Sequence, residues 1–177
     1  MIRIDKLVRL ARAARLALAA IILSSLCLAP AQAQTQAQPG PEAERNRKTV
    51  DAAFARWAQG DGNFFDEVLD PEVIWTIKGS GPSAGVYRGR ADLERRALAP
   101  FVARLISPVR PERWRLWAEG DHVIAEWEGV AVVCGGKPYR NSYVWILRLR
   151  DGRATEVAAY LDLPAYDAVL SGAASPR

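Results

Sequence analysis

The 177-residue chain has a formal net charge of +4, but residues 1–33 hold five of its 24 basic residues and one of its 20 acidic residues. The remaining 144 residues therefore carry 19 charges of each sign and no basic tract, which argues against nucleic acid as a partner. That length is typical of one domain with its own core. One His and two Cys provide no metal-ligand spacing, so we expect no metal and no cofactor.

The first 33 residues have the pattern of a secretory signal peptide. An apolar run, residues 16–29, precedes small residues at the positions that a signal peptidase recognises, Ala31 and Ala33. The run is too short for a permanent membrane anchor, and Leu26 fits a lipoprotein signal at Cys27 poorly. We expect cleavage after Ala33, a periplasmic or secreted protein, and a disordered leader over 34–42. The basic segment ahead of the run contains Arg3, Lys6, Arg9, Arg12 and Arg15.

The domain is predicted to begin with two helices and a strand. Val50, Ala53, Phe54 and Trp57 form one apolar stripe, which predicts a helix over residues 43–59. Gly60 ends that helix, and Asp61 is positioned to cap a short second helix that reaches Leu69. A first strand is expected over 72–77, with Val73 and Trp75 on one face and Ile74 and Thr76 on the other.

A glycine-rich loop, a bent helix and three strands are predicted next. The loop spans 79–89 with an extended piece at 86–88, and it lacks the phosphate-binding pattern of a P-loop. The helix spans 91–106, and Pro100 inside it should kink or split it. Strands follow over 113–118, 123–133 and 139–150, and His122 is expected to be an exposed turn residue. Cys134 is expected to be a buried small hydrophobe that thiol reagents label only after denaturation.

The last two strands form a predicted hairpin that supplies most of a pocket. Residues 139–150 place Asn141, Tyr143 and Trp145 on one face, and Asp151-Gly152 favours a type I′ turn. The returning strand, 154–162, places Glu156, Tyr160 and Asp162 on one parity. Aromatic side chains with a few polar groups are typical of a small-molecule pocket.

The parity of the 123–133 strand leaves two alternatives. Either Glu126 and Glu128 face solvent while Trp127 packs inward, or the two glutamates line the pocket and Trp127 lies on the outer face.

With Asn141-x-Tyr143, Arg150-Asp151-Gly152 and Tyr160-Leu161-Asp162, this order of elements resembles the nuclear transport factor 2-like superfamily. More narrowly, the chain is similar to the SnoaL-like bacterial branch, which includes polyketide cyclases. The resemblance implies a cone-shaped α+β fold over residues 43–172, followed by a disordered tail over 173–177. In that fold a curved, mostly antiparallel sheet wraps around N-terminal helices and encloses a pocket, and the outer face of the sheet commonly forms a homodimer.

Two functions of different class follow from this resemblance. The first is binding of a small, largely apolar ligand without catalysis. The second is acid/base catalysis on a small carbonyl or polycyclic substrate, in which Asp162 matches the catalytic Asp of the cyclases, although Ala158 and Ala159 replace the Arg and Glu usual before the Tyr. Asp162 also precedes Leu163-Pro164, so it is equally suited to cap the closing helix. The expected pocket residues are Trp75, Glu126, Glu128, Asn141, Tyr143, Trp145, Glu156 and Tyr160.

Overall fold

The computed structural model describes residues 40–172, which belong to one compact unit. The predicted signal peptide, most of the leader and the predicted tail lie outside the described residues. Helix α2 (Pro41–Gln59) starts inside the predicted leader, with Pro41 in its first turn. Its expected apolar stripe is buried, and Gly60 ends it in a left-handed conformation. Asn63, not Asp61, caps α3 (Phe64–Val68), since its side chain accepts a hydrogen bond from the Phe65 N–H.

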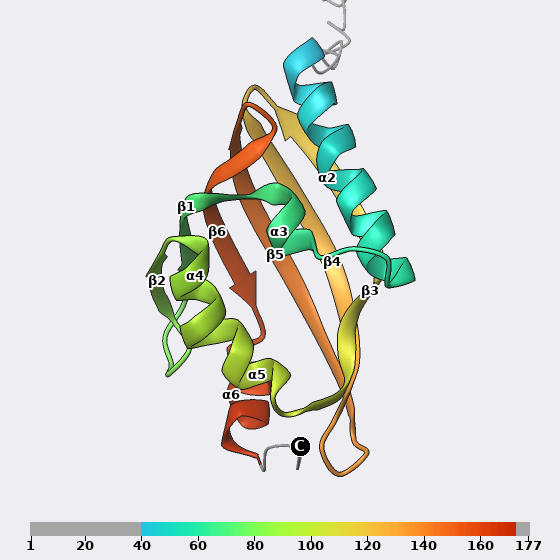
Figure 1. Cartoon of the computed structure of the whole chain (residues 1–177), viewed down its shortest axis with the longest axis vertical. Helices are drawn as coiled ribbons and strands as arrows, with labels where there is room; N and C mark the ends of the chain where they lie inside the picture. Colours follow the sequence, from blue (N-terminus) through green and yellow to red (C-terminus); the bar gives the residue numbers. More distant parts are fainter. Residues whose placement is uncertain (1–39, 173–177) are drawn as a thin grey trace, which may run out of the picture. The chain divides into compact units, whose positions relative to one another are not determined.

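Six strands form one curved sheet in the order β2-β1-β6-β5-β4-β3 (Figure 1). All neighbours are antiparallel except β1 and β6, which pair in parallel. The expected α+β architecture is confirmed, although β3 begins earlier than predicted. The strands are β1 (Leu69–Ile77), β2 (Gly85–Arg88), β3 (Leu105–Glu119), β4 (His122–Val133), β5 (Pro138–Arg150) and β6 (Arg153–Leu161).

The third predicted helix is split into three short pieces. These are α4 (Arg90–Leu93), the π-helix η1 (Glu94–Leu98) and α5 (Ala99–Val102). Pro100 has no N–H to donate to a preceding turn, so a regular α-helix cannot continue through it. The Ala99 N–H instead bonds the Glu94 carbonyl five residues back, which widens the turn ahead of the proline. The expected break at Pro100 is confirmed.

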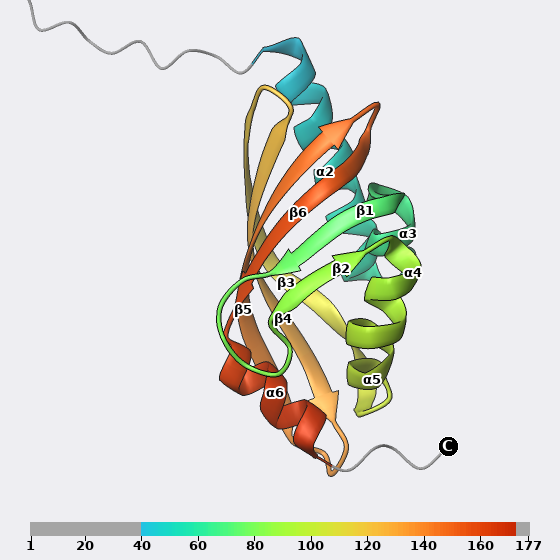
Figure 2. The ribbon, with the colours of Figure 1, turned by 90° about the vertical axis from the view of Figure 1, so that its left-hand side faces the viewer.

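Within residues 40–172, the helices before β3 lie on one face of the sheet (Figure 2). Helices α2, α3 and the α4–η1–α5 segment cover this inner face, and α6 (Leu163–Ser171) follows β6 at one end. The inner strand residues and the α2 stripe form the hydrophobic core, in which Phe54, Phe64 and Leu147 are fully buried. Among residues 40–172, no helix is both long and apolar enough to cross a membrane.

The outer face of the sheet carries an apolar row across all six strands. Its members are directly opposite one another in the strand registers, and their only polar groups are a threonine hydroxyl and a tryptophan indole N–H. From β3 to β2 the row is Trp117, Ile124, Ile146, Ala158, Thr76 and Val86. The two flanking rows contain charged residues, including Arg115 and Glu126 on one side and Arg148 and Glu156 on the other.

Candidate functional site

A cavity of about 480 Å³ lies between the inner face of the sheet and the α4–η1–α5 segment. This volume is within the range of small-molecule sites. The sheet contributes Trp75, Ile77, Pro108, Val109, Arg110, Trp127, Tyr143, Trp145, Ala159 and Leu161. The helices and their connections contribute Trp57, Gly62, Asn63, Phe65, Leu93, Glu94, Ala97, Leu98, Ala99, Phe101, Val102 and Tyr166.

The wall on the sheet side is aromatic. Trp145 lies edge-on to Trp75 and Trp127, with ring centroids 5.0 and 4.7 Å away. Trp127 stacks on Tyr143 at 4.0 Å with 9° between the ring planes. Gly129 permits this stack, because an added Cβ would lie 2.8 Å from the Trp127 ring and 3.1 Å from the Tyr143 ring. The two stacked rings together form one aromatic part of the cavity wall.

Three of the predicted pocket residues, Trp75, Tyr143 and Trp145, line this cavity. Asn141 shares their face and is buried, but it is outside the lining. Its amide donates to the Tyr139 hydroxyl (2.8 Å) and to the Asp162 carbonyl (2.9 Å), and its oxygen accepts the Asp162 N–H (3.0 Å). Asn141 therefore fixes the chain between β6 and α6.

Glu156 and Tyr160 lie on the outer face and not in the predicted pocket. The predicted turn is present, with positive φ at Asp151 and Gly152. The register, however, shifts by one residue between Arg148 and Leu149. A one-residue shift moves every later side chain to the other face, so Val157, Ala159 and Leu161 point inward instead.

Glu126 and Glu128 also lie outside the cavity, because Trp127 is the buried residue of that part of β4. The solvent-facing alternative is the one present in the structure. The two glutamates line a second hollow, of about 490 Å³, on the outer face together with Arg113 and Arg115. Glu128 pairs with Arg113 and, at 3.0 Å, with Arg140, and both pairs lower the pKa of its carboxyl.

Asp162 caps α6. Its carboxylate accepts the Ala165 N–H at 3.2 Å, the side chain is exposed, and Asp162 is not part of the cavity lining. The structure thus places Asp162 as the helix-cap alternative requires, and away from the position that the acid/base alternative requires.

Arg110 is a cavity residue that the sequence pattern did not reveal. The β3–β4 register shifts on both sides of it, between Ser107 and Arg110 and between Pro111 and Arg113. These bulges interrupt strand alternation, so that the consecutive residues Val109 and Arg110 both line the cavity. Two prolines, Pro108 and Pro111, were the available signal, since proline within a strand marks an edge or a bulge.

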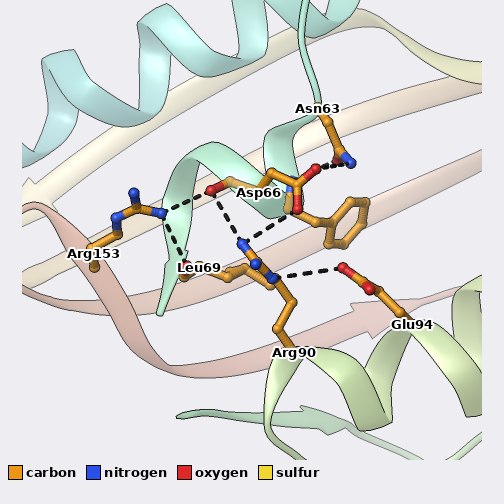
Figure 3. Close-up of polar contacts among 7 residues, drawn as sticks. Asn63, Asp66, Leu69, Arg90, Glu94 and Arg153 are labelled. Carbon is orange, nitrogen blue, oxygen red and sulfur yellow. Dashed lines mark hydrogen bonds and ion pairs between the residues drawn. The ribbon is translucent and has the colours of Figure 1, made fainter. Parts of the chain in front are cut away.

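A polar network borders the cavity between α3 and α4 (Figure 3). Arg90 lies 3.3 Å from the Asp66 carboxylate and 3.7 Å from that of Glu94. The Asn63 amide bonds Asp66 at 2.6 Å, and Arg153 donates to the Asp66 carbonyl at 2.8 Å. Glu94 and Asn63 both line the cavity, so the negative charge of Glu94 is balanced there by Arg90.

Buried tyrosines form a second polar group at the end of the cavity near α6. The Tyr139 and Tyr143 hydroxyls are 2.8 Å apart, and the Tyr166 hydroxyl donates to the Ala97 carbonyl at 3.0 Å. Burial raises the pKa of Tyr139, that of Tyr166, and most strongly that of Tyr143. These hydroxyls are protonated at neutral pH.

The raised tyrosine pKa values predict a loss of stability at high pH. Above pH about 10 the unfolded chain loses tyrosine protons that the folded protein keeps. Each such tyrosine therefore lowers the free energy of unfolding by up to about 1.4 kcal/mol per pH unit, until its folded pKa is reached. Urea unfolding between pH 8 and 11 should show this decline, with a shallower slope in Tyr143→Phe. Equal slopes in the two proteins would contradict the prediction.

Trp127 carries the one buried side-chain donor without a hydrogen-bond partner in the described part of the chain, its Nε1. The ring stands edge-on to both Trp57 and Trp145.

The remaining sequence predictions concern Cys134 and His122. Cys134 follows the end of β4 and is only partly buried, which corrects the expectation of a core residue. His122 is exposed, as expected, and lies 2.6 Å from Asp121. Across residues 40–172, no three His, Cys, Asp or Glu side chains cluster closely enough to hold a metal ion.

These features define an α+β domain in which a curved sheet and a broken helix enclose an apolar, aromatic-lined cavity. The family model described as "SnoaL-like domain" matches residues 50–157. The chain belongs to this family, which confirms the SnoaL-like resemblance inferred from its sequence, and it shares the fold of a solved NTF2-like protein. A search of the curated proteins found no match.

Solved structures share the fold at low sequence identity. An NTF2-like protein from Burkholderia xenovorans is 20% identical, covers 72% of this chain and 97% of its own, and gives a TM-score of 0.53. TerC, co-crystallised with polyporic acid, is 21% identical. It covers 72% of this chain and 98% of its own, with a TM-score of 0.57. A candidate polyketide cyclase from Xanthomonas campestris is 22% identical. It covers 73% of this chain and 99% of its own, with a TM-score of 0.57.

Proposed function

We propose that this SnoaL-like domain binds a small, largely apolar and planar molecule in the cavity between the sheet and α4–η1–α5. The stacked pair of Trp127 and Tyr143 in a cavity of about 480 Å³ carries this proposal. Among the solved relatives, TerC was crystallised with a small organic acid, which is consistent with a ligand-binding role for the fold.

A neutral aromatic ketone, 2-acetonaphthone, tests the proposal. Calorimetric titration should give saturable binding to the wild-type protein. Leu98→Trp, which fills the cavity from η1, should weaken binding at least tenfold, whereas Val86→Trp, on the exposed face of β2, should not. Absence of wild-type binding, or equal loss in both variants, would overturn the proposal.

The enzymatic alternative receives less support from the position of its proposed acid. Asp162 caps α6, and within residues 40–172 Glu94 is the only carboxylate in the lining of this cavity. An acid/base step would therefore depend on Glu94, whose charge is already paired with Arg90 at 3.7 Å.

We also propose that the protein acts outside the cytoplasm, because residues 1–33 have the charge, apolar run and small residues of a signal peptide. The intact mass of protein recovered from the periplasm should correspond to a chain that starts at Gln34. A mass that still includes Met1–Ala33 would contradict this prediction.

The outer face of the sheet supports a homodimer. The apolar row from Trp117 to Val86 lies there, with Trp117, Ile124 and Val86 exposed and the other three members partly exposed. Contiguous apolar surface of this kind is typical of an interface. Arg115 and Glu126 are directly opposite each other beside the row, yet neither forms an ion pair within residues 40–172. In a twofold arrangement each can pair with the other residue of a second copy.

Light scattering should therefore report a dimer at micromolar concentration. Ile124→Asp places a charge in the row and should produce a monomer, because burying an unpaired carboxylate is costly. Ile106→Asp, at a more exposed isoleucine outside the row, should remain dimeric. A monomeric wild-type protein would refute the proposal.

A further inference from the structure

Among the residues that the structure describes, Arg110 is the one cationic side chain in the cavity lining. Among residues 40–172, no carboxylate lies within 4.0 Å of its guanidinium, whereas the lining carboxylate, Glu94, is paired with Arg90. The unbalanced charge in the wall is therefore positive.

The guanidinium has unused hydrogen-bonding capacity. An arginine has five N–H donors and stays charged at any ordinary pH. Within the described part of the chain, Arg110 makes a single hydrogen bond, from Nη1 to the Trp57 carbonyl at 3.1 Å. That bond caps the C-terminus of α2, where a cation is favourable, but it leaves the other donors for solvent or a ligand.

Neighbouring backbone groups fix the position of the guanidinium. Gly60 lies against it, since a Cβ added there would be 3.1 Å from Nη2 and 3.8 Å from Nε. The bulges around Arg110 direct its side chain to the inner face, and the Trp57 carbonyl holds one end of the fork. An arginine held in this way loses little conformational entropy when an anion binds.

We propose that the ligand is a planar aromatic or polycyclic acid whose carboxylate, or an equivalent anionic oxygen pair, binds Arg110 while its rings lie against Trp127 and Tyr143. This inference rests on the proposed function of the cavity and adds the chemical class of its ligand. Guanidinium and carboxylate form short, charge-assisted bonds in a matched geometry. The surrounding apolar wall reduces the screening of this attraction by water.

Two probes of nearly the same size and shape separate the contribution of the charge to binding from that of the rings. These are 2-naphthoate, an anion at pH 7, and 2-naphthamide, its neutral counterpart. Calorimetric titration of the wild-type protein should show the acid binding at least about tenfold more tightly than the amide. Arg110→Gln should bind the two probes about equally. The matched control is Arg104→Gln, which removes another partly buried arginine that donates to backbone carbonyls but lies outside the lining, and it should keep the wild-type preference.

The outcomes distinguish this inference from the function on which it rests. If the wild-type protein binds both probes with equal affinity, the cavity binds aromatic molecules but the acidic ligand is wrong. A preference for the acid that persists in Arg110→Gln also overturns the inference. If neither probe nor 2-acetonaphthone binds, the proposed function itself fails. The wild-type ratio is decisive even if Arg110→Gln does not fold, because an amide that binds as tightly as the acid contradicts the proposal.

Discussion

Replacing Trp145 with alanine is expected to lower the free energy of unfolding by about 3–5 kcal/mol. Trp145 is buried at the centre of the aromatic cluster and contacts rings from α2, α3, β1, β4 and β5. Its removal leaves a void that several rigid rings cannot fill together. Because a domain of this size has a total stability of about 5–15 kcal/mol, the loss is a large part of it.

Urea unfolding monitored by circular dichroism measures this change without depending on tryptophan fluorescence. Trp145→Phe is the matched control, since it keeps a ring in the cluster and should lose less than half as much stability. Similar losses in the two variants would show that the void is not the source of the effect.

Asn141→Ala is expected to lower the free energy of unfolding by about 2–4 kcal/mol, although it removes only one short side chain. The substitution deletes three hydrogen bonds at a buried position and leaves both backbone groups of Asp162 and the Tyr139 hydroxyl short of a partner. Each unsatisfied buried group costs about 1–3 kcal/mol, and water reaching the exposed Asp162 should reduce the sum.

Two neighbouring substitutions calibrate that measurement. Ser142→Ala changes the adjacent, exposed residue on the other face of β5 and should alter stability by less than about 0.5 kcal/mol. Asp162→Ala removes only the α6 cap and should cost about 1 kcal/mol. If Asn141→Ala lowers the free energy of unfolding no more than Asp162→Ala does, the hydrogen bonds of Asn141 between β5 and the start of α6 contribute little to stability.

The inner face of β5 was predictable because it follows strict alternation. Asn141, Tyr143 and Trp145 share a parity, and Asp151-Gly152 correctly gave the turn that follows. Continuing the alternation directly from this turn, however, predicted the wrong face for Glu156 and Tyr160. An unbroken two-residue hairpin would place Tyr160 opposite Tyr143, but the bulge pairs Tyr143 with Leu161. A bulge of this kind depends on the twist and packing of the assembled sheet, which a single strand's pattern does not record.

The helical wall of the cavity was only partly predictable. The break at Pro100 follows from local chemistry, and so does the apolar face that includes Leu98 and Phe101. Whether that face fills its space or leaves a cavity depends on how the broken helix is spaced from the sheet. Arg110 was missed for a related reason, since its inward direction results from two bulges in β3 and not from the residue's own type.

The pairing of β1 with β6 joins the strands that come first and last in the sequence, with Trp75 opposite Val157. Bringing together residues so far apart in sequence costs chain entropy before any contact repays it, which slows folding. During synthesis, β1 and β2 emerge long before the strand that connects them to β5. The cavity wall formed by Trp75 and Trp145 therefore cannot close until residues 153–161 are available. We expect this domain to fold after its C-terminal strand is made, and a chain that ends before Arg153 to expose aromatic surface that chaperones recognise.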